Sequence, residues 1–164
     1  MSAEPWMRGP LEGVEAFVQP VFFSFQQVRE DLETHTSGLT TEQVWTQPTE
    51  NLASLGFHLR HIPGSIQRLT TYLMERTITP EQIAFLKAEA TPGASLSELT
   101  SALHDGLAAC EAELRTIAPK EIHSPRFIGR KRLPTTVLGL LVHIAEHTQR
   151  HLGQAITTAK LVRG

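Results

Sequence analysis

Apolar residues recur at intervals of three and four along most of the chain, which is the spacing of one face of an α-helix. The most regular stripe is Leu55, Leu59, Ile62, Ile66, Leu69 and Leu73. Similar stripes run from Val14 to Leu32 and from Leu96 to Ile117, and a fourth follows Pro134. We predict four amphipathic helices of roughly 20 to 30 residues each. Helices of this kind bury their apolar faces against one another, so the pattern indicates an all-α four-helix bundle.

Capping boxes mark the starts of three helices. In this motif a Ser or Thr side chain and a Glu or Gln three residues later bind free backbone N–H groups. The pairs are Thr40–Gln43, Thr79–Gln82 and Ser95–Glu98. The first pair predicts a short helix through Trp45, and the second predicts a short helix that ends near Glu89. The third pair opens the third long helix.

Other boundaries rest on prolines and on loss of the helical period. Pro20 indicates that the first helix begins or bends there, because proline lacks a backbone N–H. The second long helix is predicted to begin near Asn51. Residues 118–133 have no helical period, so we predict an irregular crossing segment with a short extended piece at 126–130. Pro134 is predicted to open the last helix.

Length and composition narrow the class of protein. The 164 residues are 40% hydrophobic and 20% charged, which predicts that residues 1–164 form one folded domain. A net charge of −2 gives no general attraction for nucleic acid. No apolar run approaches the roughly 20 residues that span a bilayer, and the N-terminus lacks the layout of a signal peptide. Cys110 is the only cysteine and lies in an apolar stripe, so we interpret it as a core residue in a cytoplasmic protein.

Histidines supply the most unusual chemistry of the sequence. His143, His147 and His151 follow one another at intervals of four, so consecutive members lie one above the other on a helix. Two imidazoles in this relation can bind one metal ion, as in the HExxH motif. Each further step of four residues turns by roughly 40°, so three in a row seldom reach the same ion. A pair from this helix therefore needs a third ligand from elsewhere.

His58 and His61 are the candidates for that ligand. On a helical projection they lie at one edge of the apolar stripe of the second long helix, and the later histidines lie at the same edge of theirs. A single histidine at such an edge is usually a structural, hydrogen-bonded residue. Five on two helices are harder to explain in this way, and they favour a half-buried metal site that opens to solvent.

Two stretches resemble the DinB-like (YfiT-like) family of metalloproteins. They are SLGFHLRHIPGSIQRL at 54–69 and LPTTVLGLLVHIAEHTQRHLGQ at 133–154. The resemblance implies a four-helix bundle with a long crossover and a short extra helix, often as a homodimer. It also implies a divalent metal ion between the second and fourth long helices.

Carried over by position, the resemblance assigns three metal ligands. One is His61, and the others are His147 and His151 of the HxxxH element that precedes Gly153 and Gln154. The projection places His58 closer to the core than His61, so His58 is kept as an extra ligand or a hydrogen-bond partner of one. His143 and Gln154 are expected to hydrogen-bond a ligand or a substrate.

A three-histidine site leaves a coordination position open, where an ion activates water or polarises a substrate. Zinc and nickel suit imidazole ligands, and iron is a third candidate. The family resemblance then implies a hydrolase or a low-molecular-weight-thiol transferase acting on an unidentified small molecule. The alternative is a non-catalytic stress-related or interaction protein with a closed, structural metal site. The basic residues Arg126 and Arg130–Arg132 either hold an anion or form an ordinary solvated loop, and we favour the loop.

Overall fold

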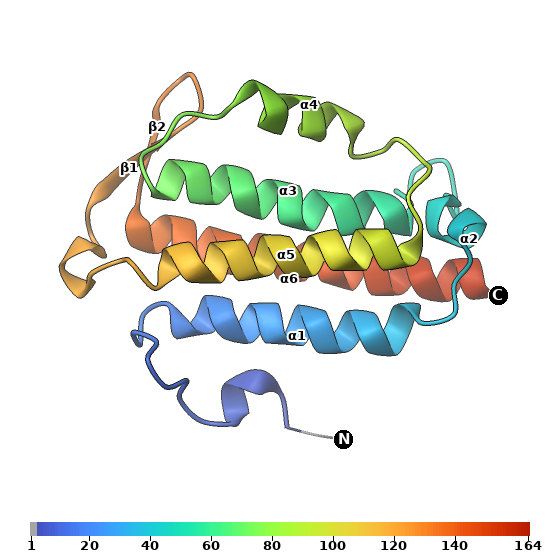
Figure 1. The fold of residues 1–164 in the computed structure, drawn as a ribbon, viewed down its shortest axis with the longest axis horizontal. Helices are drawn as coiled ribbons and strands as arrows, with labels where there is room; N and C mark the ends of the chain where they lie inside the picture. The colour runs from blue at the N-terminus through green and yellow to red at the C-terminus, as the bar shows by residue number, and fades with distance from the viewer. Residues whose placement is uncertain (1–2) are drawn as a thin grey trace.

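Six α-helices, two 3-10 turns and a two-stranded hairpin make up residues 3–164, the part of the chain that the computed structural model describes (Figure 1). The long helices are α1 (Gln19–Thr36), α3 (Leu55–Leu73), α5 (Leu96–Leu114) and α6 (Val137–Arg163). The shorter elements are η1 (Pro5–Met7), α2 (Thr41–Trp45), α4 (Pro80–Ala88), η2 (Pro119–Glu121), β1 (Pro125–Ile128) and β2 (Leu133–Thr136).

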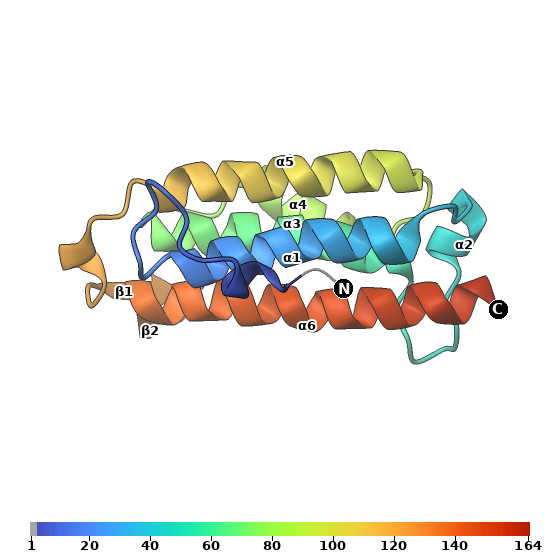
Figure 2. The same cartoon turned by 90° about the horizontal axis from the view of Figure 1, so that it is seen from below.

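The long helices form a four-helix bundle. Helix α1 packs mainly against α6, and α3 packs against both α5 and α6. Helices α1 and α3 therefore lie diagonally opposite one another, as do α5 and α6 (Figure 2). The connection at 37–54, which contains α2, crosses one end of the bundle, and the connection at 115–136 crosses the other. The predicted bundle with a long crossover is confirmed. Within residues 3–164, no helix combines the length and apolar character needed to cross a membrane.

The bundle core is built from the predicted apolar stripes. Leu59, Ile62 and Ile66 of α3 are each at most 1% exposed. Cys110 of α5 is also buried, with its sulfur 3.2 Å from the Thr70 hydroxyl. Burial raises the pKa of this thiol to about 12, so it stays protonated and is not a nucleophile at neutral pH.

Helix starts follow the capping residues. All three predicted capping boxes are present, at the starts of α2, α4 and α5. Helix α1 begins at Gln19, with Pro20 in its first turn. Helix α3 begins at Leu55 and not near Asn51, because the Ser54 side chain caps it by accepting a hydrogen bond from the Phe57 N–H at 3.2 Å.

The segment before α6 differs from the sequence prediction. β1 and β2 form an antiparallel hairpin in which Phe127 is paired with Pro134. The extended piece was predicted, but its partner strand was missed and Pro134 does not open the helix. Helix α6 begins at Val137, where the Thr136 side chain accepts from the Gly139 N–H at 3.0 Å. The four residues of β2 show no apolar–polar alternation, so only pairing with β1 identifies them as a strand.

Arg126 is also placed differently from the prediction. It is buried, whereas the basic run was expected to be solvated. Its Nε donates to the backbone carbonyl oxygen of Leu73 at 2.6 Å, and a guanidinium nitrogen lies 3.7 Å from the Glu75 carboxylate. Arg126 therefore fastens the hairpin to the C-terminal end of α3.

Candidate metal centre

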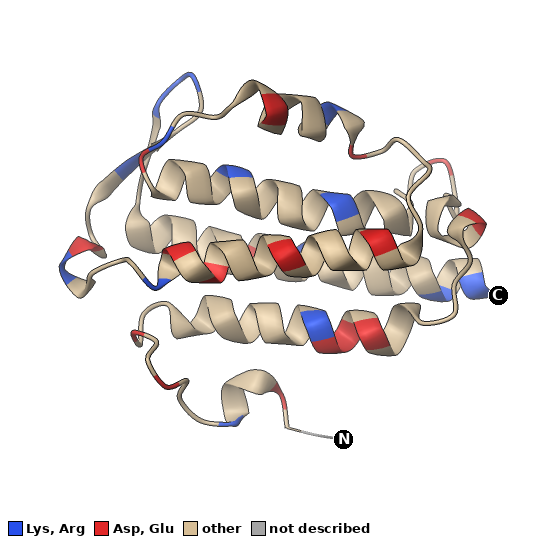
Figure 3. Cartoon of the chain, in the orientation of Figure 1, with Lys and Arg blue, Asp and Glu red and all other residues tan. Residues whose placement is uncertain are grey.

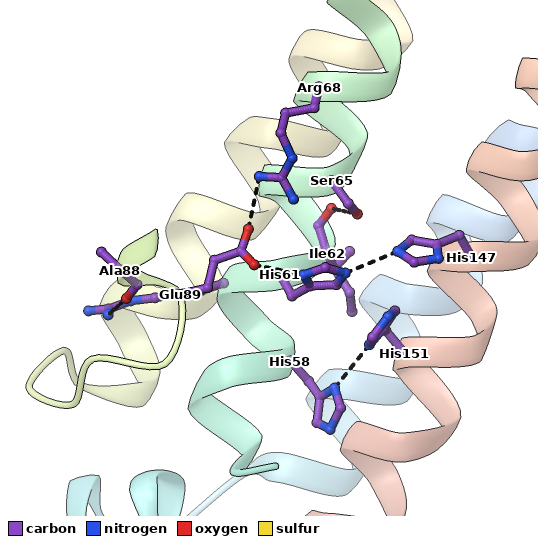
Figure 4. A network of polar contacts seen from close by, with 10 residues as sticks. His58, His61, Ile62, Ser65, Arg68, Ala88, Glu89, His147 and His151 are labelled. Atoms are coloured by element: carbon purple, nitrogen blue, oxygen red, sulfur yellow. Dashed lines mark hydrogen bonds and ion pairs between the residues drawn. The ribbon is translucent and has the colours of Figure 1, made fainter. Parts of the chain in front are cut away.

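Histidines of α3 and α6 face one another where these two helices pack (Figure 4). His61, His147 and His151 each offer one ring nitrogen, and the three atoms lie within 4.8 Å of one another. The chain positions immediately after His61 and His151 are Ile62 and Leu152, which are buried in the core. When the apolar stripes of the two helices pack together, the histidines at their edges are brought together as well. The three predicted ligands therefore form one cluster.

The spacing of the ring nitrogens fits a metal ion. Nε2 of His61 lies 3.0 Å from Nε2 of His147, a hydrogen-bond distance at which one of the two nitrogens carries a proton. Two imidazole nitrogens bound to one tetrahedral ion, each about 2.0–2.1 Å from it, lie about 3.3 Å apart. A metal ion could take the place of the shared proton if the two nitrogens moved apart by only a few tenths of an ångström.

His58 lies next to the cluster as a hydrogen-bond partner. Its Nδ1 is 3.1 Å from Nδ1 of His151, and its side chain is buried. This contact engages Nδ1 of His151 and leaves Nε2 of that ring for an ion. Of the two roles predicted for His58, the geometry favours hydrogen bonding to a ligand over ligation.

Glu89, at the end of α4, supports His61 and was missed by the sequence analysis. One carboxylate oxygen of Glu89 lies 2.7 Å from Nδ1 of His61, and the other accepts from Arg68 at 2.9 Å (Figure 4). The Phe57 ring stacks on His61, with centroids 5.2 Å apart and an interplanar angle of 17°. A carboxylate on Nδ1 fixes the tautomer that presents Nε2, and it increases the basicity of the ring. No sequence pattern marks Glu89, because it reaches His61 only through the packing of α4 on α3.

Gly64 allows α4 to come this close. A Cβ atom at position 64 would lie 2.6 Å from a ring carbon of Phe85 and 2.7 Å from a carboxylate oxygen of Glu89. Both distances are shorter than van der Waals contact, so the absent side chain is a condition for the placement of Glu89.

The Gly64→Ala variant is expected to bind a metal ion more weakly than wild type and to lose stability of about 1–3 kcal/mol through overpacking, partly offset by a gain in helix propensity. The matched control is Gly153→Ala in α6, where an added Cβ meets no atom within 4 Å. This control should be as stable as wild type or more stable by up to about 1 kcal/mol. Thermal melting and metal titration of both variants check the prediction; equal behaviour of the two would contradict it.

The rings of His58, His147 and His151 are neutral at pH 7. Burial, assisted by the nearby charge of His61, lowers the pKa of His58 to about 4 and that of His151 to about 3. Burial and the same neighbour also lower the pKa of His147. Neutral imidazole is the form that binds metal ions, so these rings are ready for ligation without losing a proton from an imidazolium.

These pKa values predict that acid destabilises the metal-free protein. Histidine in the unfolded chain has a pKa of about 6.5. As pH falls below that value the unfolded chain binds more protons than the folded one, and the equilibrium shifts toward unfolding. The melting temperature should therefore be at its plateau above about pH 6.5 and fall between about pH 6.5 and pH 5. Replacing His58 and His151 together with glutamine should flatten this slope, and a wild-type melting temperature that does not change over the range would refute the prediction.

The two remaining predicted site residues, His143 and Gln154, lie outside the cluster, on the more exposed side of α6. Nδ1 of His143 contacts the Glu146 carboxylate at 2.7 Å, and Glu146 also accepts from Arg150, as predicted. Nδ1 of His147 is buried and has no hydrogen-bond partner among residues 3–164, so His143 does not bind it. Gln154 is exposed, and its side chain makes no hydrogen bond within the described chain. The structure therefore does not bring His143 or Gln154 into the ligand network.

Comparison with known proteins identifies the family. The model of the DinB superfamily matches residues 24–155, a segment that contains all three clustered histidines. The chain belongs to the DinB superfamily. No protein with a curated description matches this DinB protein in sequence.

Two solved structures share the fold of this DinB protein. A conserved protein from Enterococcus faecalis superposes with a TM-score of 0.73 at 18% identity, covering 92% of this chain and 99% of that one. YfiT from Bacillus subtilis superposes with a TM-score of 0.65 at 16% identity, covering 93% and 91%. YfiT is described as "a probable metal-dependent hydrolase with an unusual four-helix bundle topology". At these identities the likeness shows a common fold.

Proposed function

We propose that this DinB protein is a metal-dependent hydrolase whose divalent ion is bound by His61, His147 and His151. The observation that carries the proposal is the cluster itself, three ring nitrogens within 4.8 Å of one another on two packed helices. Three neutral ligands leave at least one coordination position open, and an ion bound there lowers the pKa of a bound water toward 7. Zinc and nickel are the proposed ions, with iron third, because all three accept imidazole.

The side chains around the cluster have separate tasks in this proposal. Glu89 and Phe57 hold the His61 ring, and His58 holds the His151 ring by its Nδ1. In the contact between His58 and His151, His58 uses its Nδ1 to hydrogen-bond a metal ligand. This supports a site with three histidine ligands and an open position over a closed site with four histidine ligands. A carboxylate that could act as a base at the rim is Glu146, but it is already engaged by His143 and Arg150.

The test combines metal analysis with an activity screen. Purified protein is expected to contain about one divalent ion per chain, the stoichiometry of a single three-histidine site. Metal-loaded protein should hydrolyse members of a panel of esters, amides and phosphoesters; chelation should abolish the activity, and reloading should restore it. The panel is repeated with a low-molecular-weight thiol, because a thiolate could occupy the same open position. Activity only with thiol would replace the hydrolase by the thiol transferase, and a tightly bound ion with no activity in either screen would favour the structural alternative.

A further inference from the structure

A cavity of about 770 Å³ lies between the C-terminal half of α3, helix α4 and the β-hairpin. Figure 1 shows the hairpin and α4 on the same side of α3. The volume is within the range of about 300–1,000 Å³ typical of small-molecule sites. The cavity is separate from the histidine cluster. It includes Arg130 and Arg132 of the basic run, for which the sequence analysis gave anion binding as the less favoured interpretation.

Positive charge predominates around this cavity. Four arginines line it, Arg68, Arg76, Arg130 and Arg132, against one carboxylate, that of Glu75. Arg68 and Arg76 are paired with Glu89 and Glu113, neither of which lines the cavity. Within residues 3–164, no hydrogen bond or ion pair engages the side chains of Arg130 and Arg132. Figure 3 shows basic residues in blue on the hairpin. Two guanidinium groups without carboxylates are suited to bind an anion.

The other part of the lining is apolar and only partly covered. Ile83 and Leu86 of α4 are 39% and 45% exposed, and Phe127 of the hairpin is 42% exposed. The Arg132 guanidinium lies over the Phe127 ring at 4.4 Å from its centroid, so an apolar surface and a cationic group adjoin one another. This combination fits an organic anion with an apolar body better than a small inorganic ion.

Arg68 joins this cavity to the candidate metal centre. It lines the cavity, and it also donates to Glu89, the carboxylate that holds His61. His61 and Arg68 are seven residues apart on α3, a rise of about 10 Å along the helix axis. Two polar contacts, from Arg68 to Glu89 and from Glu89 to His61, therefore link the lining of the cavity to the histidine cluster.

We propose that this cavity binds the anionic end of the substrate, so that the substrate class is an organic anion, a carboxylate or phosphate, with an apolar body. The assignment rests on the proposed function for its link to the metal ion. Arg130 and Arg132 would bind the anionic group, and Ile83, Leu86 and Phe127 would contact the apolar body.

The test is an NMR titration of the full-length, zinc-loaded protein with phenylpropionate, phenyl phosphate and the neutral phenylpropanol. At millimolar concentrations the two anions should shift the signals of Tyr72, Phe127 and Gly129 saturably, and the alcohol should bind at least about tenfold more weakly. Replacing Arg130 and Arg132 together with glutamine should weaken anion binding at least about tenfold. The matched control replaces Lys120 and Lys160, which are exposed and outside the cavity, and should bind as wild type does.

Several results would overturn the proposal. These are the absence of saturable shifts with either anion, equal affinity for the alcohol, and equal loss of affinity in the lysine control. Metal content is measured on the same samples, which separates the two claims. Protein that holds zinc but binds neither anion refutes the cavity assignment and leaves the metal centre intact. Protein that binds the anions but takes up no metal refutes the proposed function, and with it the substrate role of the cavity.

Discussion

Replacing His147 with alanine is expected to reduce bound divalent metal from about one ion per chain to background, with a loss of affinity of more than about a hundredfold. The residue offers one of three ligand atoms, and the other two alone cannot hold an open-site ion. His61→Ala should behave in the same way, although the two residues are 86 positions apart in sequence. Metal analysis by mass spectrometry after dialysis, with competition against a chromophoric chelator, measures both effects.

Two matched histidine variants control for this result. His104→Ala removes an exposed histidine of α5 and should leave the metal content unchanged. His143→Ala should also retain the ion. The His143 ring lies beside His147, with centroids 5.3 Å apart, but its Nδ1 contacts Glu146 and it makes no hydrogen bond to a cluster nitrogen. Full metal retention in both cluster variants, or equal loss in His104→Ala, would rule out the proposed ligand set. Loss in His143→Ala alone would mean that the ion lies nearer the rim than proposed.

Replacing Glu89 with alanine is expected to weaken metal binding by about 10–100-fold, and Glu89→Gln by an amount toward the lower end of that range. Glutamine can still accept a hydrogen bond from Nδ1 of His61, but it lacks the negative charge that makes the ring more basic. Glu89 is 2% exposed, so loss of its charge acts in a medium that screens it little. Metal titrations at several pH values should show the weaker binding of both variants.

Arg68→Met separates this effect from general damage to the fold. It removes the other partner of Glu89 and leaves the contact between Glu89 and His61 in place. We expect Arg68→Met to lose some stability, since the carboxylate remains buried without its ion pair, while keeping metal affinity close to that of wild type. If Arg68→Met and Glu89→Ala weaken metal binding equally, Glu89 acts by stabilising α4 and does not position the His61 ring.

Most features that depend on residues close together in the sequence were predicted correctly, and several features that depend on distant residues were missed. The capping boxes and apolar stripes involve residues three or four positions apart, and the helices they predicted are present. The short strand β2 was missed because its conformation depends on pairing with β1. Arg126 was misplaced for a similar reason, since its burial requires the backbone of Leu73, which is 53 residues away.

The histidines of the cluster were predictable for two different reasons. The interval of four placed His147 and His151 on one helical face, which is a local property of the sequence. The family resemblance selected His61, whereas the helical projection alone placed His58 nearer the core. The structure accounts for both: His58 is the more buried ring, and His61 is the one that presents a nitrogen to His147.

The sequence by itself determined four amphipathic helices, the capping boxes of α2, α4 and α5, and the edge of each apolar stripe on which the histidines lie, because these features depend on short-range backbone geometry. The tertiary structure decided which edges meet and which groups support them. Glu89 contacts His61 across 28 residues only because α4 packs on α3 where Gly64 leaves room. The arginine-lined cavity likewise exists only where three separate elements adjoin. Such contacts follow from packing between distant segments, and no local pattern specifies them.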